Sequence, residues 1–463
     1  PEHLKNPSMV NIHNYFNKYY VPNNMAISMS GDLDFEETVA LIDKYFGNFE
    51  RSILEPTEHK AADPLTKAIE VDVFGPQDEF MQLGYRVGNI KSQDRKYVAL
   101  IEQMLSNQKA GLIDLNLVQA QKVLRAGSSS NFMKEYGFQL LYGYPKQGQK
   151  LEEIRDLLLG EIEKIKKGEF EDWMMTAAIN NLKLRTLRSL ETNGRAHMFV
   201  DAFANDIDWN EYLAFYDNLE KITKEELVKF ANKTYKDNYV VVYKRNGKNE
   251  NVVKVEKPAI TAIKIDRTKE SEFFKALMAE PSKKIEPEFI DFEQSIQTSQ
   301  LKGGVKISYI KNTVNPLFEL YYLLPMGKDH NKKLEIAVNY LPYLGTDKYS
   351  ASELQQELFK NGLSFGVQTS NDESYVYMSG LEDNLNIGIE LLEHILSNVK
   401  PDQDAYNEYV KGLIRMRMNS KQNKDDILWD GLFNYGKYGA KSAATDILSN
   451  KDLTEINPQE LTE

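Results

Sequence analysis

Residues 390–394 read ELLEH, one letter away from HxxEH, the zinc signature in which two histidines bind the metal and a glutamate activates water. The surrounding stretch, NLNIGIELLEHILSNVK, has the apolar spacing of an ordinary helix. Its predicted apolar stripe is formed by Leu385, Ile389, Leu392 and Leu396. Its predicted polar flank holds Glu390, Glu393 and His394. We therefore expect a solvated helix face at ELLEH and no metal site.

The other residue types that could perform chemistry are scattered along the chain. No partner stands at a metal-ligand interval from the remaining histidines, which are His3, His13, His59, His197 and His330. The serine run AGSSSNF (126–132) lacks the setting and glycine spacing of a nucleophile elbow, so we predict a loop. ETNGRA (191–196) has one glycine and indicates a helix break instead of a phosphate loop. The sequence therefore assigns no catalytic, cofactor-binding or metal-binding residue.

Composition narrows the class of protein. With 463 residues and 41% apolar content, the chain can bury a substantial core and is expected to contain two to four domains. A net charge of -12 argues against nucleic-acid and anionic-membrane partners, which require clustered Lys and Arg. The absence of cysteine excludes disulfides and thiolate sites, and no apolar run approaches the roughly 18 residues of a membrane span. Because PEHLKNPSMV shows neither an initiator Met nor a signal peptide, we expect an excised piece of a longer protein.

The first 50 residues predict a helix, a strand and a second helix. MAISMS (25–30) is a short β-prone run. Asp34 is expected to cap the second helix, with Glu37 completing a capping box and Gly47 ending the helix. The apolar face of this helix is expected to hold Phe35, Val39, Ile42 and Phe46.

Three internal echoes indicate a duplication. ANKTYKDN in the stretch 222–247, which has a capping box at Thr223 and Glu226 before the strand YVVVYK, matches FNKYYVPN at a shift of 215 residues (16 to 231). Two further pairs are LEKITKEEL (219–227) with LTEINPQEL (453–461), and residues 79–105 with residues 317–343. The last pair predicts strand, polar loop and apolar helix in both copies, and ELYYLL (319–324) within it is predicted to be sheet core. Repeats about 215–240 residues apart favour duplicated modules of normal domain size.

The chain is accordingly divided into four parts. Residues 1–50 are the tail of a first module, 65–247 a second module, 248–285 a linker with one helix at SEFFKALMA, and 286–463 a truncated third module. Strands and helices follow one another in separated groups. The predicted fold class is therefore α+β, with tandem homologous modules that each pack a mostly antiparallel sheet against helices.

These segments, in this order, resemble insulinase/pitrilysin-type metallopeptidases. NYFNKYYVPNNMAISMSGDLD followed by KYFGNF is similar to the close of the zinc-bearing module of that family, and KITKEELVKFANKTYKDNYVVVYK to the close of the next module. Residues 343–381 resemble the segment that follows HxxEH. The resemblance implies a peptidase of four α/β modules that close around a peptide, of which this chain lacks the zinc-binding part of the first module and the whole fourth module.

The family pattern can be laid over the third module residue by residue. In active modules the first histidine of HxxEH lies nine residues before a Gly-Thr pair, so the resemblance places the three motif positions at Ile336, Asn339 and Tyr340, before Gly345–Thr346. The helix expected to supply the third ligand matches residues 411–421, which contain no carboxylate. The third module is therefore expected to be a non-catalytic copy.

The functional expectation is the structural and substrate-enclosing portion of a zinc metalloendopeptidase. In the parent protein, the resemblance implies zinc, a peptide substrate, and a zinc-bound water activated by the HxxEH glutamate; this chain alone is expected to bind no zinc and to be inactive. The alternative is a non-catalytic peptide-binding or scaffold relative, and the sequence upstream of Pro1 would decide between them. A bacterial periplasm or cell envelope is compatible with the absence of cysteine.

The first 50 residues and the truncated third module are each expected to lack partners for their strands. A lone strand at 25–30 would leave backbone groups unpaired, and a truncated third module would expose a sheet edge. We therefore predict that residues 1–50 supply a strand to the third module, within one chain or by exchange in a dimer. The alternative is that residues 1–50 fold locally against the second module or remain mobile.

Overall fold

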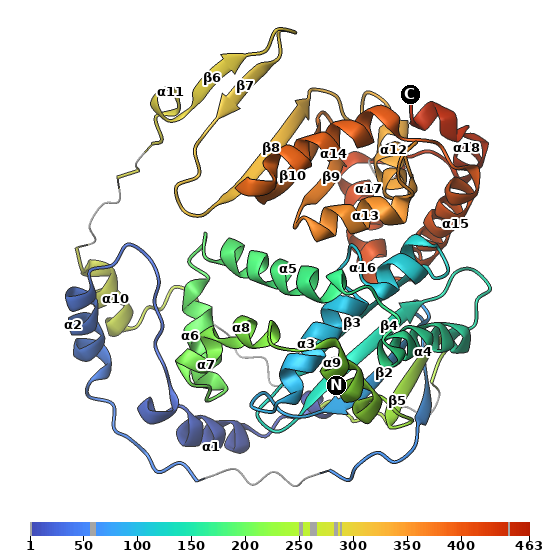
Figure 1. Cartoon of the computed structure of the whole chain (residues 1–463). Helices are drawn as coiled ribbons and strands as arrows, with labels where there is room; N and C mark the ends of the chain where they lie inside the picture. Colours follow the sequence, from blue (N-terminus) through green and yellow to red (C-terminus); the bar gives the residue numbers. More distant parts are fainter. Residues whose placement is uncertain are drawn as a thin grey trace. The chain divides into compact units, whose positions relative to one another are not determined.

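The computed structural model comprises two compact units, which are described separately (Figure 1). The smaller unit is Pro1–Tyr20 with Asn251–Asn315, and the larger is Val21–Glu250 with Pro316–Glu463. The structure describes residues 2–55, 62–249, 253–259, 266–281, 286–287, 289–442 and 445–463.

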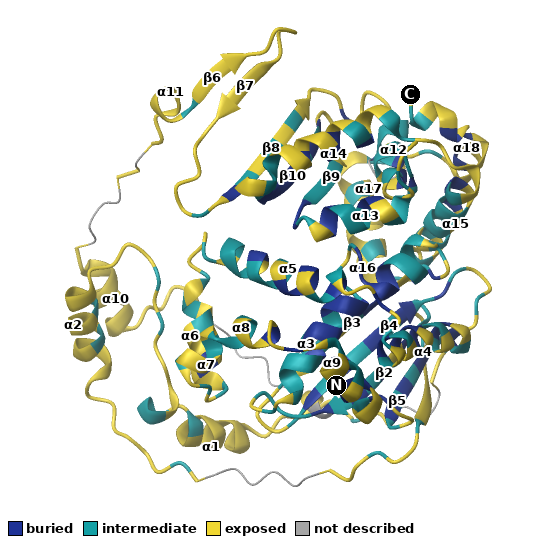
Figure 2. Cartoon of the chain, viewed as in Figure 1, coloured by how far each residue is buried: buried dark blue, intermediate teal, exposed yellow. Residues whose placement is uncertain are grey.

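The smaller unit consists of short elements with little burial. Helices α1 (Met9–Tyr19) and α10 (Glu272–Ala279) bury none of their residues and are exposed along their length (Figure 2). Helix α10 is the helix predicted within the linker. Strands β6 (Gln297–Gln300) and β7 (Lys306–Tyr309) form an antiparallel hairpin preceded by α11 (Phe292–Ser295). This unit therefore has no hydrophobic core of its own among the described residues.

In the larger unit, helix α2 (Phe35–Phe46) forms as predicted, but the strand before it does not. The Asp34 side chain accepts a hydrogen bond from the Glu37 amide at 2.8 Å, and Gly47 follows the last turn. The expected apolar face of α2 is largely solvent-exposed. Residues 25–30 were predicted to be a strand, and this is wrong, because no neighbouring strand satisfies their backbone groups in the described structure.

The second module is built on a five-stranded sheet in the order β1-β5-β2-β4-β3. Strands β1 and β5 are parallel and the other neighbours are antiparallel. The strands are β1 (Ile69–Gly75), β2 (Phe80–Val87), β3 (Arg125–Phe132), β4 (Gly137–Tyr144) and β5 (Tyr239–Asn246). On the central strand β2, burial alternates from residue to residue, as expected for a strand with one face on the core.

Helices α3 (Asp94–Leu105), α4 (Leu151–Lys167) and α9 (Lys224–Thr234) pack with this sheet in one core cluster. The reciprocal hydrogen bonds between Thr223 and Glu226 form the predicted capping box of α9. Gly168 ends α4 with φ 70°, a left-handed conformation that favours glycine. The chain also forms a π-helical turn η3 (Asp114–Gln119) and helices α5 (Trp173–Ser189), α6 (Arg195–Ala204), α7 (Trp209–Leu213) and α8 (Phe215–Leu219).

The serine run AGSSSNF, which was predicted to be a loop, is most of strand β3. Glycine and serine have low β propensity, so the local sequence gave a loop signal. The strand forms because all eight of its residues pair with β4 in unbroken antiparallel register. Tertiary pairing therefore overrides local preference in this segment. The break predicted at ETNGRA is confirmed, since α5 ends at Ser189 and α6 begins at Arg195.

The third module contains a smaller sheet in the order β8-β10-β9. Its strands are β8 (Leu317–Leu324), β9 (Ser364–Thr369) and β10 (Ser374–Leu381), and both pairings are antiparallel. The main helices are α12 (Lys333–Tyr340), α13 (Ala351–Lys360), α14 (Leu385–Asn398) and α15 (Gln403–Ser420). Short elements follow at α16 (Lys424–Asp426), η6 (Ile427–Phe433), α17 (Asn434–Tyr438) and α18 (Asn450–Glu455). Both modules thus have the predicted α+β fold with mostly antiparallel sheets.

The two segments predicted to be homologous occupy like elements. Residues 79–105 form β2 and α3, and residues 317–343 form β8 and α12. The strands correspond at a shift of 237 residues, because Met81 lies opposite Gly143 and Phe318 lies opposite Gly380. In the ungapped match of residues 79–105 with 317–343, whose shift is 238, the buried Val98 of α3 is aligned with the buried Ile336 of α12. That match therefore places the strands one residue out of register. Such an offset assigns each side chain of β8 to the wrong face of the sheet.

Side chains from the two modules meet in the larger unit. The Lys109 ammonium lies 2.7 Å from Ser364 Oγ and 3.2 Å from the Leu363 carbonyl oxygen. Lys146 pairs with Glu408 across the same junction. Aromatic packing adds to these polar contacts, because the rings of Trp173 and Phe359 are 6.4 Å apart in an edge-on arrangement.

Candidate functional site

The predicted metal position of the third module is filled by hydrophobic core. Ile336 is 4% exposed and Tyr340 is fully buried, and both pack with Tyr406 and Val410 of α15. The Tyr340 hydroxyl donates to the Asp402 carbonyl oxygen at 2.5 Å and accepts from the Asp402 amide at 2.9 Å. Burial also raises the pKa of Tyr340, which keeps its hydroxyl neutral. These side chains serve packing instead of ligation.

The remaining parts of the motif do not suit zinc either. Asn339, at the position of the general base, is exposed and donates from Nδ2 to the Glu335 carbonyl oxygen at 2.8 Å. It borders a cavity of about 200 Å³ whose other lining residues are mostly apolar. Residues 411–421 lie largely in α15, where Leu413 packs against the same core. The donor set at this position does not fit a zinc ion.

His394 of ELLEH is less solvated than predicted. Its side chain is 23% exposed, and Nε2 lies 2.9 Å from Thr346 Oγ1 and 3.6 Å from a carboxylate oxygen of Asp347. Its ring also meets the ring of Tyr349 edge-on, at 5.7 Å between centroids. The buried face of α14 is Gly388, Leu391, Leu392 and Ile395, whereas Ile389 and Leu396 of the predicted stripe are exposed. The helix is rotated relative to the prediction, which turns His394 onto the loop that contains Gly345.

The structure brings none of the other histidines into a metal cluster within the residues it describes. His13, His197 and His330 are exposed. His59 and the side chain of His3 lie outside the described residues.

The matching helix of the second module carries a partly buried carboxylate that sequence reasoning missed. At the shift of 238 residues, Glu102 of α3 corresponds to Tyr340 of α12. Burial raises the pKa of Glu102, and the hydrogen bond from the Ser130 hydroxyl and the positive charge of Arg185 lower it in part. The shift between the modules was the signal that could have identified this residue.

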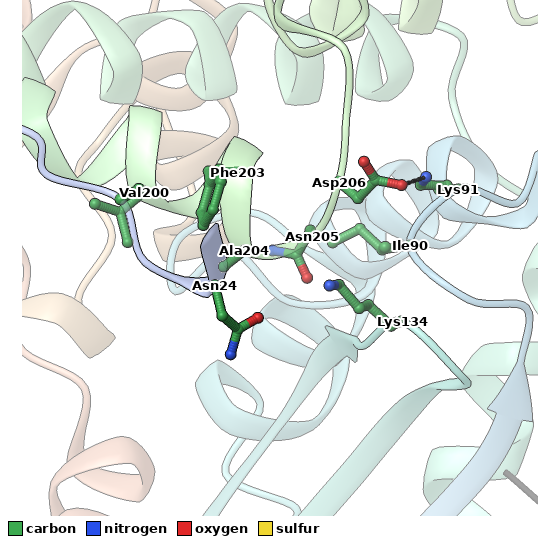
Figure 3. Close-up of a pocket in the computed structure, with 10 residues that line it drawn as sticks. Asn24, Ile90, Lys91, Lys134, Val200, Phe203, Ala204, Asn205 and Asp206 are labelled. Carbon is green, nitrogen blue, oxygen red and sulfur yellow. Dashed lines mark hydrogen bonds and ion pairs between the residues drawn. The ribbon is translucent and has the colours of Figure 1, made fainter. Parts of the chain in front are cut away.

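A cleft of about 710 Å³ opens elsewhere on the second module (Figure 3). Ile90, Lys91 and Lys134 form one wall, and residues 200–206 at the end of α6 form another. The segment that contains Asn24 closes a third side. Sequence reasoning missed this cleft, because its walls come from segments that are far apart in the chain and contain no recognisable motif.

The two lysines of this cleft lie on loops that are joined by hydrogen bonds. The Ile90 amide donates to the Met133 carbonyl oxygen at 3.0 Å, and Asn89 Nδ2 donates to the Lys134 carbonyl oxygen at 3.0 Å. Together these bonds join the loop after β2 to the turn between β3 and β4. Lys91 and Lys134 are thereby held on one wall by backbone contacts, and their flexible side chains reach into the cleft.

The opposite wall contains an aspartate in an unusual conformation. Asp206 has φ 52°, in the left-handed region that normally favours glycine or asparagine. Its amide donates to the Phe203 carbonyl oxygen at 3.0 Å, and the Ile207 amide donates to the Ala202 carbonyl oxygen at 2.9 Å. These two bonds form the Schellman motif that ends α6. Holding a non-glycine residue there costs about 1 kcal/mol.

The cleft has more positive than negative charge. Lys91 pairs with Asp206 at 2.5 Å and lowers the pKa of the Asp206 carboxyl. The side chain of Lys91 is 49% exposed and that of Asp206 is 80% exposed. Such an exposed pair contributes little stability. Lys134 makes no side-chain hydrogen bond or ion pair with the residues that the structure describes. Two ammonium groups therefore face one carboxylate.

Residues 10–182 match the family described as the peptidase M16 inactive domain. The zinc protease PqqE of Helicobacter pylori is 23% identical over 242 residues, which are 50% of this chain and 54% of that protein. The chain thus spans about half the length of that curated relative.

The fold is also similar to that of a solved structure. Pitrilysin aligns with a TM-score of 0.51 and 13% identity, over 100% of this chain and 51% of its own. A protease from Helicobacter pylori aligns with a TM-score of 0.49 and 21% identity, over 52% of this chain and 60% of that one. No helix among the described residues is long and apolar enough to cross a membrane.

Proposed function

Because the chain belongs to the insulinase/pitrilysin family of peptidases, we propose that it forms the non-catalytic, substrate-enclosing portion of a zinc metalloendopeptidase. The observation that supports this proposal most directly is the core around Tyr340. Two side chains at positions where active modules bear imidazoles, Ile336 and Tyr340, are buried against α15. A module that has filled its metal position with core can hold or enclose a substrate but lacks the means to activate water.

In this proposal the zinc chemistry belongs to the parent enzyme and is supplied by residues outside this chain. The substrate is a peptide, because hydrolysis of a peptide bond by a zinc-bound water is the chemistry of the family that the chain resembles. We place the parent in the bacterial periplasm or cell envelope, and cell fractionation of the source organism tests this placement.

Two measurements on the purified chain test the proposal. Elemental analysis after dialysis should show no stoichiometric zinc, and unstructured peptides should bind without being cleaved. Stoichiometric zinc together with chelator-sensitive cleavage would show that the chain is itself an enzyme. Failure of every unstructured peptide to bind would leave the substrate-enclosing role without support, and would favour a scaffold instead.

A further inference from the structure

We propose that the cleft of Figure 3 binds a carboxylate of a peptide through Lys134, with a neighbouring apolar side chain of the peptide packed on α6. This inference rests on the proposed function and deepens it, because it names the chemistry of a substrate segment. The carboxylate can be that of an Asp or Glu side chain or that of the peptide's C-terminus, since both offer the same two oxygens.

The charges of the cleft favour an anionic group. Lys91 forms an ion pair with Asp206 at 2.5 Å, whereas the Lys134 ammonium forms no ion pair with the side chains that the structure describes. Asn205 Nδ2 donates to the Asp201 carbonyl oxygen at 2.9 Å, which holds this amide against α6. Lys134 and Asn205 both line the cleft, and Figure 3 shows the side-chain oxygen of Asn205, not its nitrogen, on the side of Lys134. The Lys134 ammonium is therefore the group of this cleft that can pair with a carboxylate of the ligand.

The wall formed by α6 favours an apolar neighbour. Phe203 is 52% exposed and Val200 is 39% exposed, and both line the cleft beside Ala204. Ile90 faces them from the opposite loop. A ligand that covers these side chains removes apolar surface from water, which is favourable. The volume of about 710 Å³ lies within the range of roughly 300–1,000 Å³ that is typical of ligand sites, so several peptide residues can enter.

The positive charge of this cleft contrasts with the negative net charge of the chain. The chain as a whole carries a net charge of -12 and repels acidic peptides at long range. Binding of an acidic segment would therefore depend on the short-range contacts of Lys134. Added salt should weaken binding, because it screens the attraction between exposed charges.

The test uses fluorescence anisotropy with the full chain and four labelled, unstructured peptides of otherwise identical sequence. The first has a Phe-Asp pair and an amidated C-terminus, and the second has Phe-Asn and an amidated C-terminus. The third has Phe-Asn and a free C-terminal carboxylate, and the fourth has Phe-Lys and an amidated C-terminus. The first or the third peptide should bind about tenfold more tightly than the second, as expected for one charge-assisted hydrogen bond. Which of the two does so identifies the source of the carboxylate.

Three variants locate the binding. Lys134→Ala should weaken binding of the preferred peptide by about tenfold. Asp206→Asn should tighten it by about threefold, because it releases Lys91, and asparagine is well tolerated at a φ of 52°. Lys233→Ala is the matched control, since Lys233 is an exposed lysine of α9 that does not line the cleft.

The outcomes separate this inference from the function on which it rests. Equal affinity for the acidic and neutral peptides would overturn the carboxylate site and leave the substrate-enclosing role intact. The same conclusion follows if Lys134→Ala and Lys233→Ala behave alike. Absence of binding by all four peptides would overturn both proposals.

Discussion

The sheets of the second and third modules differ at one edge. In the second module, β5 lies between β1 and β2, so β2 has a partner on both sides. The corresponding strand β8 pairs with β10 alone in the described structure. On the face that packs against the core, Met81 and Leu83 of β2 are fully buried, whereas Phe318 and Leu320 at the corresponding positions of β8 are only partly buried. Similar strand sequences therefore become core or surface according to the partners available, and burial cannot be assigned from the strand pattern alone.

The largest expected effect comes from truncating matched residues in the two sheets. Leu83 of β2 is fully buried, and its equivalent Leu320 in β8 is only partly buried. Leu83→Ala should lower the free energy of unfolding by about 3 kcal/mol, and Leu320→Ala by about 1 kcal/mol, because the second site loses less burial. Urea unfolding followed by two independent probes measures both. Equal losses would contradict the difference in packing described above.

Rebuilding the metal motif should damage the third module without restoring the metal. The triple substitution Ile336→His, Asn339→Glu and Tyr340→His introduces HxxEH, but it places two imidazoles in a buried apolar cluster. We expect a loss of about 2–4 kcal/mol of stability and no zinc by elemental analysis. Asn339→Glu alone serves as the control, because Asn339 is exposed and the change should stay within about 0.5 kcal/mol. Stoichiometric zinc in the triple variant would contradict the interpretation of this position.

The junction between the modules should respond to pH through Lys109. Burial, together with the charges of Arg188 and Arg185, lowers the pKa of Lys109 to about 8. Between about pH 8 and the ordinary lysine pKa near 10.4, the unfolded chain binds more protons than the folded chain, so stability rises with pH. The gain should be on the order of 1–2 kcal/mol after allowance for partial solvation.

Lys109→Met should flatten this rise in denaturant unfolding measured between pH 7.5 and 10. Lys233→Met, at an exposed position, should leave the slope unchanged. Parallel curves for the wild-type protein and Lys109→Met would show that Lys109 titrates as an ordinary lysine.

The smallest expected effect concerns residues 1–50 and the free edge of β8. Strand donation to this edge stays a prediction, and residues 25–30 instead make a contact near α6, where Ser28 Oγ donates to the Ala196 carbonyl oxygen at 2.9 Å. Because α2 buries none of its residues, deleting residues 1–50 should change the melting temperature by only a few degrees unless a strand is exchanged. Mass measurement in solution detects an exchanged dimer. An unchanged melting temperature with an unchanged oligomeric state would eliminate strand donation.

Elements specified by local chemistry could be predicted from the sequence. The capping box at Thr223 and Glu226 and the cap at Asp34 depend on residues three positions apart, so they are legible in the chain. The α+β class and the strand-then-helix order of both copies followed from periodicity. Asn339, Ile336 and Tyr340 could also be identified as non-ligating from their residue types.

Features specified by distant partners could not be predicted. Strand β3 needs β4 to form, and MAISMS, despite its β-prone sequence, forms no strand because it lacks such a partner. The prediction that ELYYLL is sheet core was wrong in part, since Tyr321 and Leu323 lie on the open side of β8. The cleft could not be predicted from the sequence either, because Lys91, Lys134 and Asp206 come together only in the folded chain.

The Gly345–Thr346 pair has a structural role that does not depend on a metal. A side chain on Gly345 would place its Cβ 2.7 Å from the Tyr349 carbonyl oxygen, and the Gly345 carbonyl oxygen accepts a hydrogen bond from the Lys400 amide at 2.9 Å. Thr346 forms a bridge to Val399 and lies against His394. This turn fastens α14 to the segment after α12 whether or not a metal is present. The fold itself therefore requires this turn, whichever residues occupy positions 336 and 340.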